Sequence, residues 1–325
     1  MALVAEYKAS LKSIEVEEPI DLAVHRPLAF LLAKAARPTP ITPNQLTLFS
    51  MVLGACSGLV MLTENRMAPL VGAGLLFTSQ VVDCSDGMLA RMRKSGSELG
   101  RMLDGIADSI TLTFAVIGAL SLLVRQMHGT PGQALGWIVL GIATVYTSSL
   151  HTSAYDHYKN LFLRMTVPDN HEGEDVEHAE ARWDAARRGG MALVHRAVFP
   201  IYVGYLVSQR RLVAWFDPAS LVELDALPPV TPARAAVYRR HMLPTMRIWR
   251  ALFGVGSLVF GLALFIALGH IEVFLLFRLV ALNAVFFGYL LPAQRRASRE
   301  AFAELGVRPL DPTEGGRPRR ADARG

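Results

Sequence analysis

The stretch VVDCSDGMLARMRKSGSELGRMLDGIADSI, residues 81–110, links two apolar segments and carries four aspartates. Asp83 and Asp86 are three residues apart, so they fall on one face of a helix. The same holds for Asp104 and Asp108, which are four residues apart. The polar, turn-prone residues RKSGSELG between the pairs predict the end of one helix and the start of the next. Because adjacent antiparallel helices joined by a short turn bring these ends to one depth, we expect the four carboxylates to converge on one pocket.

The apolar segments beyond this stretch decide the fold class. Hydrophobic residues make up 52% of the 325 residues and charged residues only 19%, which is more apolar surface than one soluble core needs. Runs of about 20 apolar residues suffice to cross a bilayer. We therefore predict an all-α, polytopic membrane helical bundle over residues 43–292, with about six transmembrane helices and an N-terminal amphipathic interfacial helix. The spans are placed near residues 44–63, 68–92, 100–125, 133–158, 245–268 and 271–292.

Local signals place the start of the bundle. Residues 1–42 are predicted to be a cytosolic or interfacial segment, in which an amphipathic helix at 19–36 is interrupted by Pro27. Thr42 is predicted to cap the first span, with Pro43 at its first helical position. Small residues inside the first two spans are expected to permit close contact between helices. They are Gly54, Gly58, Gly72 and Gly74.

The second half of the chain contains a long insertion and a basic tail. Residues 159–244 are expected to be cytosolic or interfacial, and the charged segment 173–188 within them to be a solvated helix. A membrane crossing at 191–209 would move the basic C-terminus to the opposite side from the other basic loops, so we predict an interfacial or re-entrant helix there. Residues 293–325 are expected to form a basic cytosolic tail, disordered over 308–325.

Four converging carboxylates require compensation, because ionised carboxylates repel one another and are costly in an apolar setting. Divalent cations supply it, and oxygen ligands alone favour magnesium, calcium or manganese over zinc. Two metals bridged by carboxylates is an arrangement that clamps a phosphoryl or diphosphate group. The alternative is a set of salt bridges between helices, for instance of Asp104 with Arg91 or Arg101, which suits one aspartate better than four.

The spacing Asp83-x2-Asp86-Gly87-x2-Ala90-Arg91-x8-Gly100-x3-Asp104-x3-Asp108 is similar to the signature of the CDP-alcohol phosphotransferase (CDP-alcohol phosphatidyltransferase) superfamily, without a departure. The resemblance covers roughly residues 40–160 and includes the segment TPNQLT before and within the first span. It implies a membrane enzyme that takes a CDP-linked donor and a hydroxyl acceptor, releases CMP and forms a phosphodiester.

The resemblance also implies roles for individual residues. Asp83, Asp86 and Asp104 are implied to bind Mg²⁺ or Mn²⁺, with two metals expected. Asp108 is implied to be the general base for the acceptor hydroxyl, and it is also counted among the metal-binding carboxylates. The positions expected to shape the CDP site are Gly87, Ala90, Arg91 and Gly100, and Asn44 is an additional candidate contact to the nucleotide.

Basic residues are candidates for binding an acceptor or lipid phosphate. Lys159 ends the fourth predicted span, and Arg247 and Arg250 begin the fifth. All three could instead reach lipid headgroups from the membrane interface. Arg278 lies inside the sixth span, where an arginine normally faces the bundle and has a partner.

These features predict an integral-membrane phosphotransferase of phospholipid synthesis with CDP-diacylglycerol as donor. A CDP-choline or CDP-ethanolamine transferase to a lipid hydroxyl is the alternative, followed by an intramembrane prenyltransferase and a cation transporter. Prenyltransferase motifs lie on well-separated helices, and a transporter calls for acidic residues in a second, repeat-related half. The expected partners are the two substrates, membrane lipids and a second copy in a homodimer, and not nucleic acid, because no aromatic-interleaved basic stripe is present. If the chain is bacterial, we expect the inner membrane, with the active site at the cytosolic face.

Overall fold

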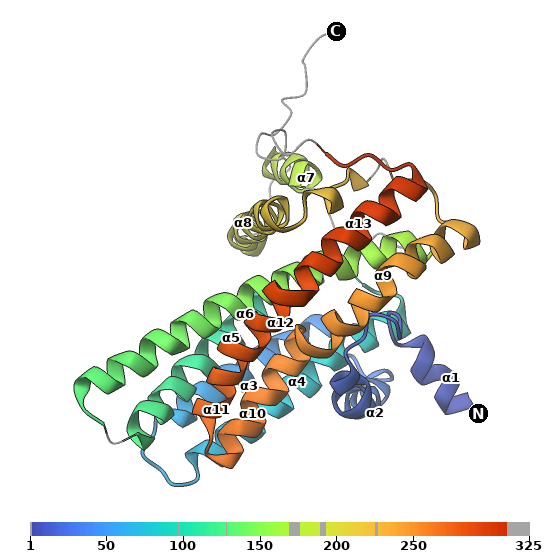
Figure 1. The fold of residues 1–325 in the computed structure, drawn as a ribbon. Coiled ribbons are helices and arrows are strands. Elements are labelled where there is room, and N and C mark those ends of the chain that lie inside the picture. The colour runs from blue at the N-terminus through green and yellow to red at the C-terminus, as the bar shows by residue number, and fades with distance from the viewer. Residues whose placement is uncertain are drawn as a thin grey trace. The chain divides into compact units, whose positions relative to one another are not determined.

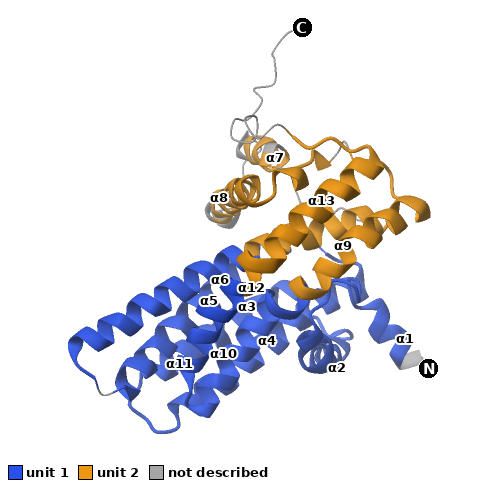
Figure 2. Ribbon diagram, in the orientation of Figure 1, with its two compact units in different colours: residues 1–152, 250–284 blue, residues 153–249, 285–325 orange. Residues whose placement is uncertain are grey.

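The chain is all-helical over the part that the structure describes. This computed structural model describes residues 2–96, 98–127, 129–168, 176–188, 193–224 and 227–310. Regular structure in these residues consists of helices, which confirms the predicted all-α class. The chain divides into two compact units (Figure 2), unit 1 with residues 1–152 and 250–284 and unit 2 with residues 153–249 and 285–325.

Unit 1 contains the two helices that carry the signature, together with the helices around them. Along the chain they are α1 (Ala2–Ala9), α2 (Arg26–Ala36), α3 (Pro43–Met61), α4 (Ala68–Arg93), α5 (Glu98–Gln126), α10 (Val255–Leu268) and α11 (Ile271–Leu276) (Figure 1). The helix α6 (Pro131–Thr166) begins in unit 1 and continues into unit 2. Helix α3 packs against both α4 and α5, and α4 also packs against α2 and α10.

Unit 2 holds the helices of the insertion and of the C-terminal region. They are α7 (Val176–Arg188), α8 (Leu193–Phe216), α9 (Pro232–Leu252), whose last residues belong to unit 1, and α13 (Leu291–Leu305). Between α11 and α13 the chain stays helical through two π-helical turns, Phe277–Leu282 and Phe286–Leu290, with the short α12 (Asn283–Val285) between them. The predicted disordered tail falls largely on residues 311–325, which lie outside the described residues.

Five helical segments among the described residues are long and apolar enough to cross a membrane. They are Pro43–Met61, Gly100–Gln126, Pro131–Thr166, Pro232–Leu268 and Ile271–Leu305. Helix α4 matches the remaining predicted span in length but is not among the five, since its second half carries Gln80, Asp83 and Asp86. Helix α8 is not among the five either, and the interfacial or re-entrant position of residues 191–209 stays a prediction.

The predicted start of α3 is confirmed. The Thr42 hydroxyl accepts a hydrogen bond from the Gln45 backbone N–H (3.3 Å), and the Gln45 side chain accepts one from the Thr42 N–H (2.9 Å). Pro43 occupies the first turn, where it has no N–H to leave unsatisfied. This reciprocal cap fixes the first residue of α3 and with it the direction of the side chains one turn later.

Glycines let α3 approach α5 closely, as predicted from the sequence. A Cβ at Gly58 would overlap the backbone carbonyl of Phe114, and one at Gly54 would overlap the Thr111 side chain. Gly72 of α4 likewise leaves room for Met61. Gly74 has open space around it, so the prediction of a close contact there is wrong; its position on α4 points away from the neighbouring helices.

We expect Gly58→Ala to destabilise unit 1. The added methyl group meets a backbone carbonyl that cannot move aside by itself, and such overpacking costs about 1–3 kcal/mol. The measurement is the thermal unfolding midpoint of the detergent-solubilised protein. Gly74→Ala is the matched control, since it adds the same methyl group to an exposed helical position and should leave the midpoint unchanged or slightly higher. Equal midpoints for the two variants would contradict the close α3–α5 contact.

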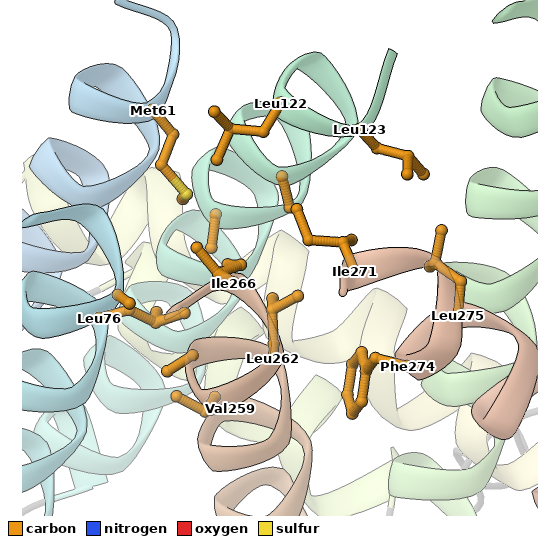
Figure 3. Packing of buried hydrophobic residues seen from close by; sticks show 14 residues of the cluster. Met61, Leu76, Leu122, Leu123, Val259, Leu262, Ile266, Ile271, Phe274 and Leu275 are labelled. Carbon is orange, nitrogen blue, oxygen red and sulfur yellow. The ribbon is translucent and has the colours of Figure 1, made fainter. Parts of the chain in front are cut away.

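A buried apolar cluster joins five helices of unit 1. Figure 3 shows its side chains pointing toward one another from α3, α4, α5, α10 and α11. The largest contributors are Met61, Leu76, Leu122, Leu123, Val259, Leu262, Ile266, Ile271, Phe274 and Leu275. Burial of each large side chain contributes roughly 1.5–3 kcal/mol in water, and close packing still contributes in lipid. This cluster therefore holds together those ends of the helices that lie far from the aspartates.

Arg93, the last residue of α4, ties the N-terminal segment to the bundle. Its guanidinium donates hydrogen bonds to four backbone carbonyls around the end of α2 and the connection to α3. The acceptors are Ile41 (2.6 Å), Ala36 (2.8 Å), Thr39 (2.8 Å) and Arg37 (3.0 Å). Carbonyls at a helix end lack partners within the helix, and Arg93 supplies donors to them, although the Ala36 carbonyl also accepts from the Thr39 N–H (3.0 Å). The contacts therefore fix the start of α3 next to the end of α4.

The fifth predicted span is interrupted, and Glu18 explains the interruption. Helix α9 ends at Leu252, and α10 begins one turn later with Gly254 as its N-cap. The Glu18 carboxylate accepts hydrogen bonds from the backbone N–H groups of Gly256 (3.0 Å) and Ser257 (2.7 Å). Burial, and then the neighbouring carboxylate of Asp21, raises the pKa of Glu18 to about 7. A residue of the N-terminal segment thus caps a helix that follows more than two hundred positions later.

The amphipathic helix expected at 19–36 is present, with a different break. Pro27 lies in the first turn of α2, where its missing N–H is tolerated, rather than in the middle of a helix. The residues before it, Asp21–His25, form a π-helical turn that leads into α2 without a gap. Within this turn His25 Nδ1 lies 2.7 Å from Asp21 Oδ1, and both residues are buried.

Candidate functional site

The end of α4 and the start of α5 place the four aspartates. Helix α4 stops at Arg93 because Lys94 adopts a left-handed conformation (φ 53°) and the Ser95 N–H bonds back to the carbonyl of Ala90 (2.9 Å). Helix α5 begins at Glu98. The helix end and helix start predicted for this stretch are therefore confirmed, with one aspartate pair on each side of the connection.

Three of the aspartates meet. Asp83, Asp86 and Asp104 each offer one carboxylate oxygen, and these oxygens lie within 4.8 Å of one another. Asp86 is buried, and the other two are half-buried. Three carboxylate oxygens at this separation are the donors that a hard divalent cation such as Mg²⁺ or Mn²⁺ prefers, so the residues fit the metal that the sequence predicts.

Thr47 holds one of these carboxylates. Its hydroxyl lies within hydrogen-bond distance of both the Asp86 carboxylate and the backbone carbonyl of Pro43 (3.2 Å), one turn earlier in α3. The Thr47 side chain is buried, as is Asp86. The hydroxyl therefore fixes the Asp86 side chain from the neighbouring helix. A contact of this kind orients a carboxylate that binds a metal.

Asp108 lies one turn further along α5 than Asp104. The Asp108 carboxylate interacts electrostatically with that of Asp83. Asp108 is half-buried and lies outside the set of three whose oxygens gather within 4.8 Å. Asp108 thus lies next to the group of three without being part of it, and its role as the general base stays a prediction.

Arg91 lies over Gly87 at the edge of the aspartate group. A Cβ on Gly87 would be 3.4 Å from an Arg91 guanidinium nitrogen, and Arg91 Nε donates to the carbonyl of Ser10 (2.6 Å). The positive charge of Arg91 also acts on the Asp86 carboxylate. The N-terminal segment thus orients this arginine beside the aspartates.

The other predicted nucleotide contacts lie on the same three helices. Ala90 is half-buried on α4, Gly100 is half-buried on α5, and Asn44 is half-buried in the first turn of α3. The structure places all three in unit 1 with the aspartates. Their roles in nucleotide binding stay predictions.

Two of the candidate phosphate-binding arginines make contacts inside unit 1. Arg250 donates to the backbone carbonyls of Ile14 and Glu17, the latter at 3.2 Å. Arg278 is buried inside the first π-helical turn, where its Nε donates to the Ser148 hydroxyl of α6 (2.9 Å). Arg278 therefore faces the bundle and has a partner, as predicted for an arginine within a membrane span.

The remaining basic candidates belong to unit 2. Lys159 Nζ lies 3.0 Å from a carboxylate oxygen of Asp156, one turn earlier on α6, and above the ring of Tyr155. Arg247 is exposed on α9. Each is placed by its own unit, and a role of either residue in binding a phosphate stays a prediction.

The comparison with known families agrees with the signature, with the aspartates that meet within 4.8 Å and with the apolar helices. A family model described as CDP-alcohol phosphatidyltransferase matches residues 40–161, which span α3, α4, α5 and most of α6. Residues 40–161 belong to the CDP-alcohol phosphatidyltransferase family. The family uses a divalent metal, and this domain carries the aspartate cluster that fits one. With five helices able to cross a bilayer, the chain is an integral membrane protein.

Several curated relatives match the CDP-alcohol phosphatidyltransferase domain. Cholinephosphotransferase 1 of Xenopus laevis is 29% identical over 155 residues, which are 45% of this chain and 36% of the frog protein. A CDP-diacylglycerol–glycerol-3-phosphate 3-phosphatidyltransferase of Sodalis glossinidius is 30% identical over 112 residues, 34% of this chain and 56% of that protein. The bifunctional IPC transferase and DIPP synthase of Aquifex aeolicus is 30% identical over 122 residues, 37% of this chain and 26% of that protein. The chain thus spans between a quarter and somewhat over half of these relatives' lengths.

Two residues at the edge of the domain's site were not singled out from the sequence. Thr47 lies at the end of the segment TPNQLT, where the family resemblance drew attention to the helix start and not to the hydroxyl. Arg93 lies two residues beyond the last signature position of α4 and resembles an ordinary helix-terminal cation. A threonine one turn after a capped helix start, opposite an aspartate on the next helix, is the signal that could have identified Thr47.

Proposed function

We propose that this chain transfers a phosphatidyl group from CDP-diacylglycerol to a hydroxyl acceptor and releases CMP. The observation that carries the proposal is the meeting of Asp83, Asp86 and Asp104 within 4.8 Å inside a CDP-alcohol phosphatidyltransferase domain. A diphosphate donor brings its own negative charge to such a site, so carboxylates alone would repel it. The proposed site therefore binds its donor together with divalent cations.

Asp83, Asp86 and Asp104 are the residues proposed to hold Mg²⁺ or Mn²⁺. When bound, a divalent cation neutralises the diphosphate oxygens and the charge that develops on the leaving phosphate. The buried Asp86 is kept in position by the Thr47 hydroxyl, and Asp83 and Asp104 approach it from α4 and α5. Two metal ions, rather than one, are part of the proposal.

Asp108 is proposed to take the proton from the acceptor. The acceptor oxygen forms a bond to the phosphorus that carries diacylglycerol, and the bond from that phosphorus to the oxygen of CMP breaks. The acceptor proton passes to the Asp108 carboxylate, and CMP leaves with the electron pair of the broken bond. A base is effective here if it is within hydrogen-bond reach of the acceptor hydroxyl while other groups hold the phosphate.

The donor and acceptor sites are assigned to separate groups of residues. We propose that Gly87, Ala90, Arg91 and Gly100 shape the CDP site together with Asn44. Each basic candidate is proposed separately to bind a phosphate of the acceptor or of a lipid: Arg250 and Arg278 in unit 1, and Lys159 and Arg247 in unit 2. In unit 1, Arg250 and Arg278 already have protein partners, so a phosphate would share them with backbone carbonyls or with Ser148.

The relatives support two donor classes. The Sodalis glossinidius relative is named for CDP-diacylglycerol and glycerol 3-phosphate, and the Xenopus laevis relative is named a cholinephosphotransferase. Transfer of phosphocholine or phosphoethanolamine to a lipid hydroxyl is therefore the second candidate. We further propose that the site opens to the cytosolic side of the membrane and that the chain forms a homodimer.

The test is CMP release by the purified protein in mixed micelles. CDP-diacylglycerol, CDP-choline and CDP-ethanolamine are each supplied as donor, with Mg²⁺ or Mn²⁺ and a panel of hydroxyl acceptors. The proposal expects CMP release from CDP-diacylglycerol that depends on one acceptor and stops on chelation of the metal. Release from CDP-choline or CDP-ethanolamine instead would support the second candidate, and release from no donor would reject the phosphotransferase.

Loss of the Thr47 hydroxyl is expected to weaken the metal site. Thr47→Val removes the donor that orients Asp86, and loss of such an outer contact typically lowers metal affinity or activity about 10–100-fold. Mn²⁺ affinity, measured by electron paramagnetic resonance, should fall together with CMP release, and Thr47→Ser should restore both. Thr78→Val is the matched control, since that exposed hydroxyl bonds only to its own helix among the described contacts. Unchanged Mn²⁺ affinity in Thr47→Val would show that Asp86 is held by other groups.

A further inference from the structure

Helix α8 presents an apolar, aromatic face to the outside. Ile201, Tyr205 and Trp215 have exposed fractions of 60%, 40% and 70%. At 100° per residue these three side chains, with the half-buried Leu212, fall within an arc of roughly 80°. Ser208 also falls in this arc, and its hydroxyl is satisfied by the backbone of its own helix (2.8 Å). A contiguous exposed face of this kind indicates a binding surface rather than a water-facing helix side.

The Tyr205 hydroxyl and the Gln209 side chain of α8 are turned toward α6. The Tyr205 hydroxyl donates to the Asp156 carboxylate of α6 (3.2 Å), so only the ring of this tyrosine lies on the outer face. Gln209 donates to the backbone carbonyl of Ser153 (2.9 Å) and is almost fully buried. The middle of α8 is therefore fastened to α6 by hydrogen bonds within unit 2.

The C-terminal end of α8 is fastened as well. Arg295 of α13 donates to the backbone carbonyls of Trp215 and Phe216, where the helix leaves carbonyls without partners. The next residue, Asp217, is buried and accepts a hydrogen bond from Tyr158 of α6 (3.3 Å). With both attachments in place, α8 cannot roll to bury its apolar face without breaking buried hydrogen bonds.

The part of α6 that holds α8 lies beyond the reach of the hydrocarbon core. Helix α6 has 36 residues, so at about 1.5 Å per residue it is roughly 54 Å long, whereas the hydrocarbon core is about 30 Å thick. Its first part is apolar, and its histidine and charged residues begin at His151 and continue to Arg164. Residues 153–166 are thus the part that emerges into the headgroup layer, and α8 is attached there.

We propose that α8 lies in the headgroup layer of the bilayer that the bundle crosses, with Ile201, Tyr205, Leu212 and Trp215 immersed and anionic lipids as its partner. Tyrosine and tryptophan are the side chains enriched at this depth. The α8 sequence contains three arginines and no acidic residue, and Arg211 is exposed beside the apolar arc. This charge complements anionic headgroups and is the reason for choosing a lipid surface over a second protein.

The test uses the fluorescence of Trp215 in the complete, reconstituted protein. Wild type and Trp215→Phe are placed in vesicles of phosphatidylcholine with roughly 30% phosphatidylglycerol, with acyl chains brominated near the headgroup end. The difference between the two emission spectra isolates Trp215. We expect brominated lipid to quench this difference signal by about twofold or more, and aqueous iodide to quench it little. Trp249→Phe is the matched control, because Trp249 is fully buried and its signal should respond to neither quencher.

Each other outcome overturns the proposal in a distinct way. Quenching by iodide and not by brominated lipid would place the face in water. Protection from both quenchers would show that protein covers it, a second copy of the chain if protection falls on dilution of protein in lipid. Arg211→Glu is expected to reduce quenching in the anionic vesicles to the level in pure phosphatidylcholine. If wild type gives equal quenching in both vesicle types, the assignment to anionic lipids is wrong.

Discussion

Replacement of Asp104 with asparagine is expected to abolish tight binding of Mg²⁺ or Mn²⁺ and to lower the rate of CMP release by about 10³-fold or more. Asparagine keeps the size of the side chain but removes one of three charges whose oxygens lie within 4.8 Å. A bound metal contributes several kcal/mol of charge stabilisation, and about 1.4 kcal/mol corresponds to a factor of ten in rate. The measurements are Mn²⁺ binding by electron paramagnetic resonance and CMP release.

A second measurement on Asp104→Asn reports metal binding without turnover. A metal that binds only the folded protein raises the unfolding midpoint in proportion to the logarithm of its concentration. Wild type should therefore gain thermal stability with added Mg²⁺, and Asp104→Asn should not. Glu64→Gln is the control, since it removes one carboxylate charge from an exposed position between α3 and α4 and should respond to Mg²⁺ as wild type does. A normal Mg²⁺ response in Asp104→Asn would remove this residue from the set of ligands.

Features governed by neighbouring residues could be predicted from the sequence. The cap at Thr42, the end of α4 near Arg93 and the start of α5 depend on side chains within a few positions of the helix ends, and the structure has them as predicted. The close approach of α3 to α5 follows from Gly58, because a glycine inside a span leaves the helix surface open to the backbone of a neighbouring helix. The gathering of three aspartates rests on the same local signals, applied to two helices at once.

Features that join distant segments could not be predicted in this way. The cap of α10 comes from Glu18, which is 238 positions away from Gly256. Neither residue has a local pattern that indicates the contact, and a carboxylate before an amphipathic helix is more often solvated. Arg93 is similar, since its acceptors are backbone carbonyls between 52 and 57 positions away, which no side-chain pattern marks.

The two π-helical turns between α11 and α13, the first of which contains Arg278, illustrate a further limit of prediction from the sequence. Hydropathy predicts one regular span over 271–292, and the chain is helical there throughout. The extra residue in each π-turn changes which side chains face the bundle. Arg278 lies in the first of these turns and donates a hydrogen bond to Ser148 of α6. Side-chain direction within a span thus depends on a partner from another helix that hydropathy does not include.

The role proposed for Asp108 predicts that its replacement lowers turnover but not metal binding, whereas replacement of Asp104 lowers both. We expect Asp108→Asn to lower the rate of CMP release by about 10²–10⁴-fold, the range that a positioned general base contributes. Mn²⁺ affinity and the Mg²⁺-dependent gain in thermal stability should stay close to wild type, because Asp108 lies outside the three oxygens that gather within 4.8 Å. The residual rate of the variant should also lose the rise with pH that a carboxylate base produces as it ionises.

The comparison of the two asparagine variants decides between two roles for Asp108. The Asp108 carboxylate interacts electrostatically with that of Asp83, so a metal held by Asp83 would also act on Asp108. If Asp108→Asn loses Mn²⁺ binding as Asp104→Asn does, Asp108 is a fourth ligand, and the acceptor proton must leave by another group or by water. If binding persists while turnover is lost, the three aspartates that meet around Asp86 form the metal site, and the fourth is reserved for the acceptor. The one-turn separation of Asp108 from Asp104 on α5 then has a chemical purpose, because a base that is itself bound to metal is too weak to accept the proton.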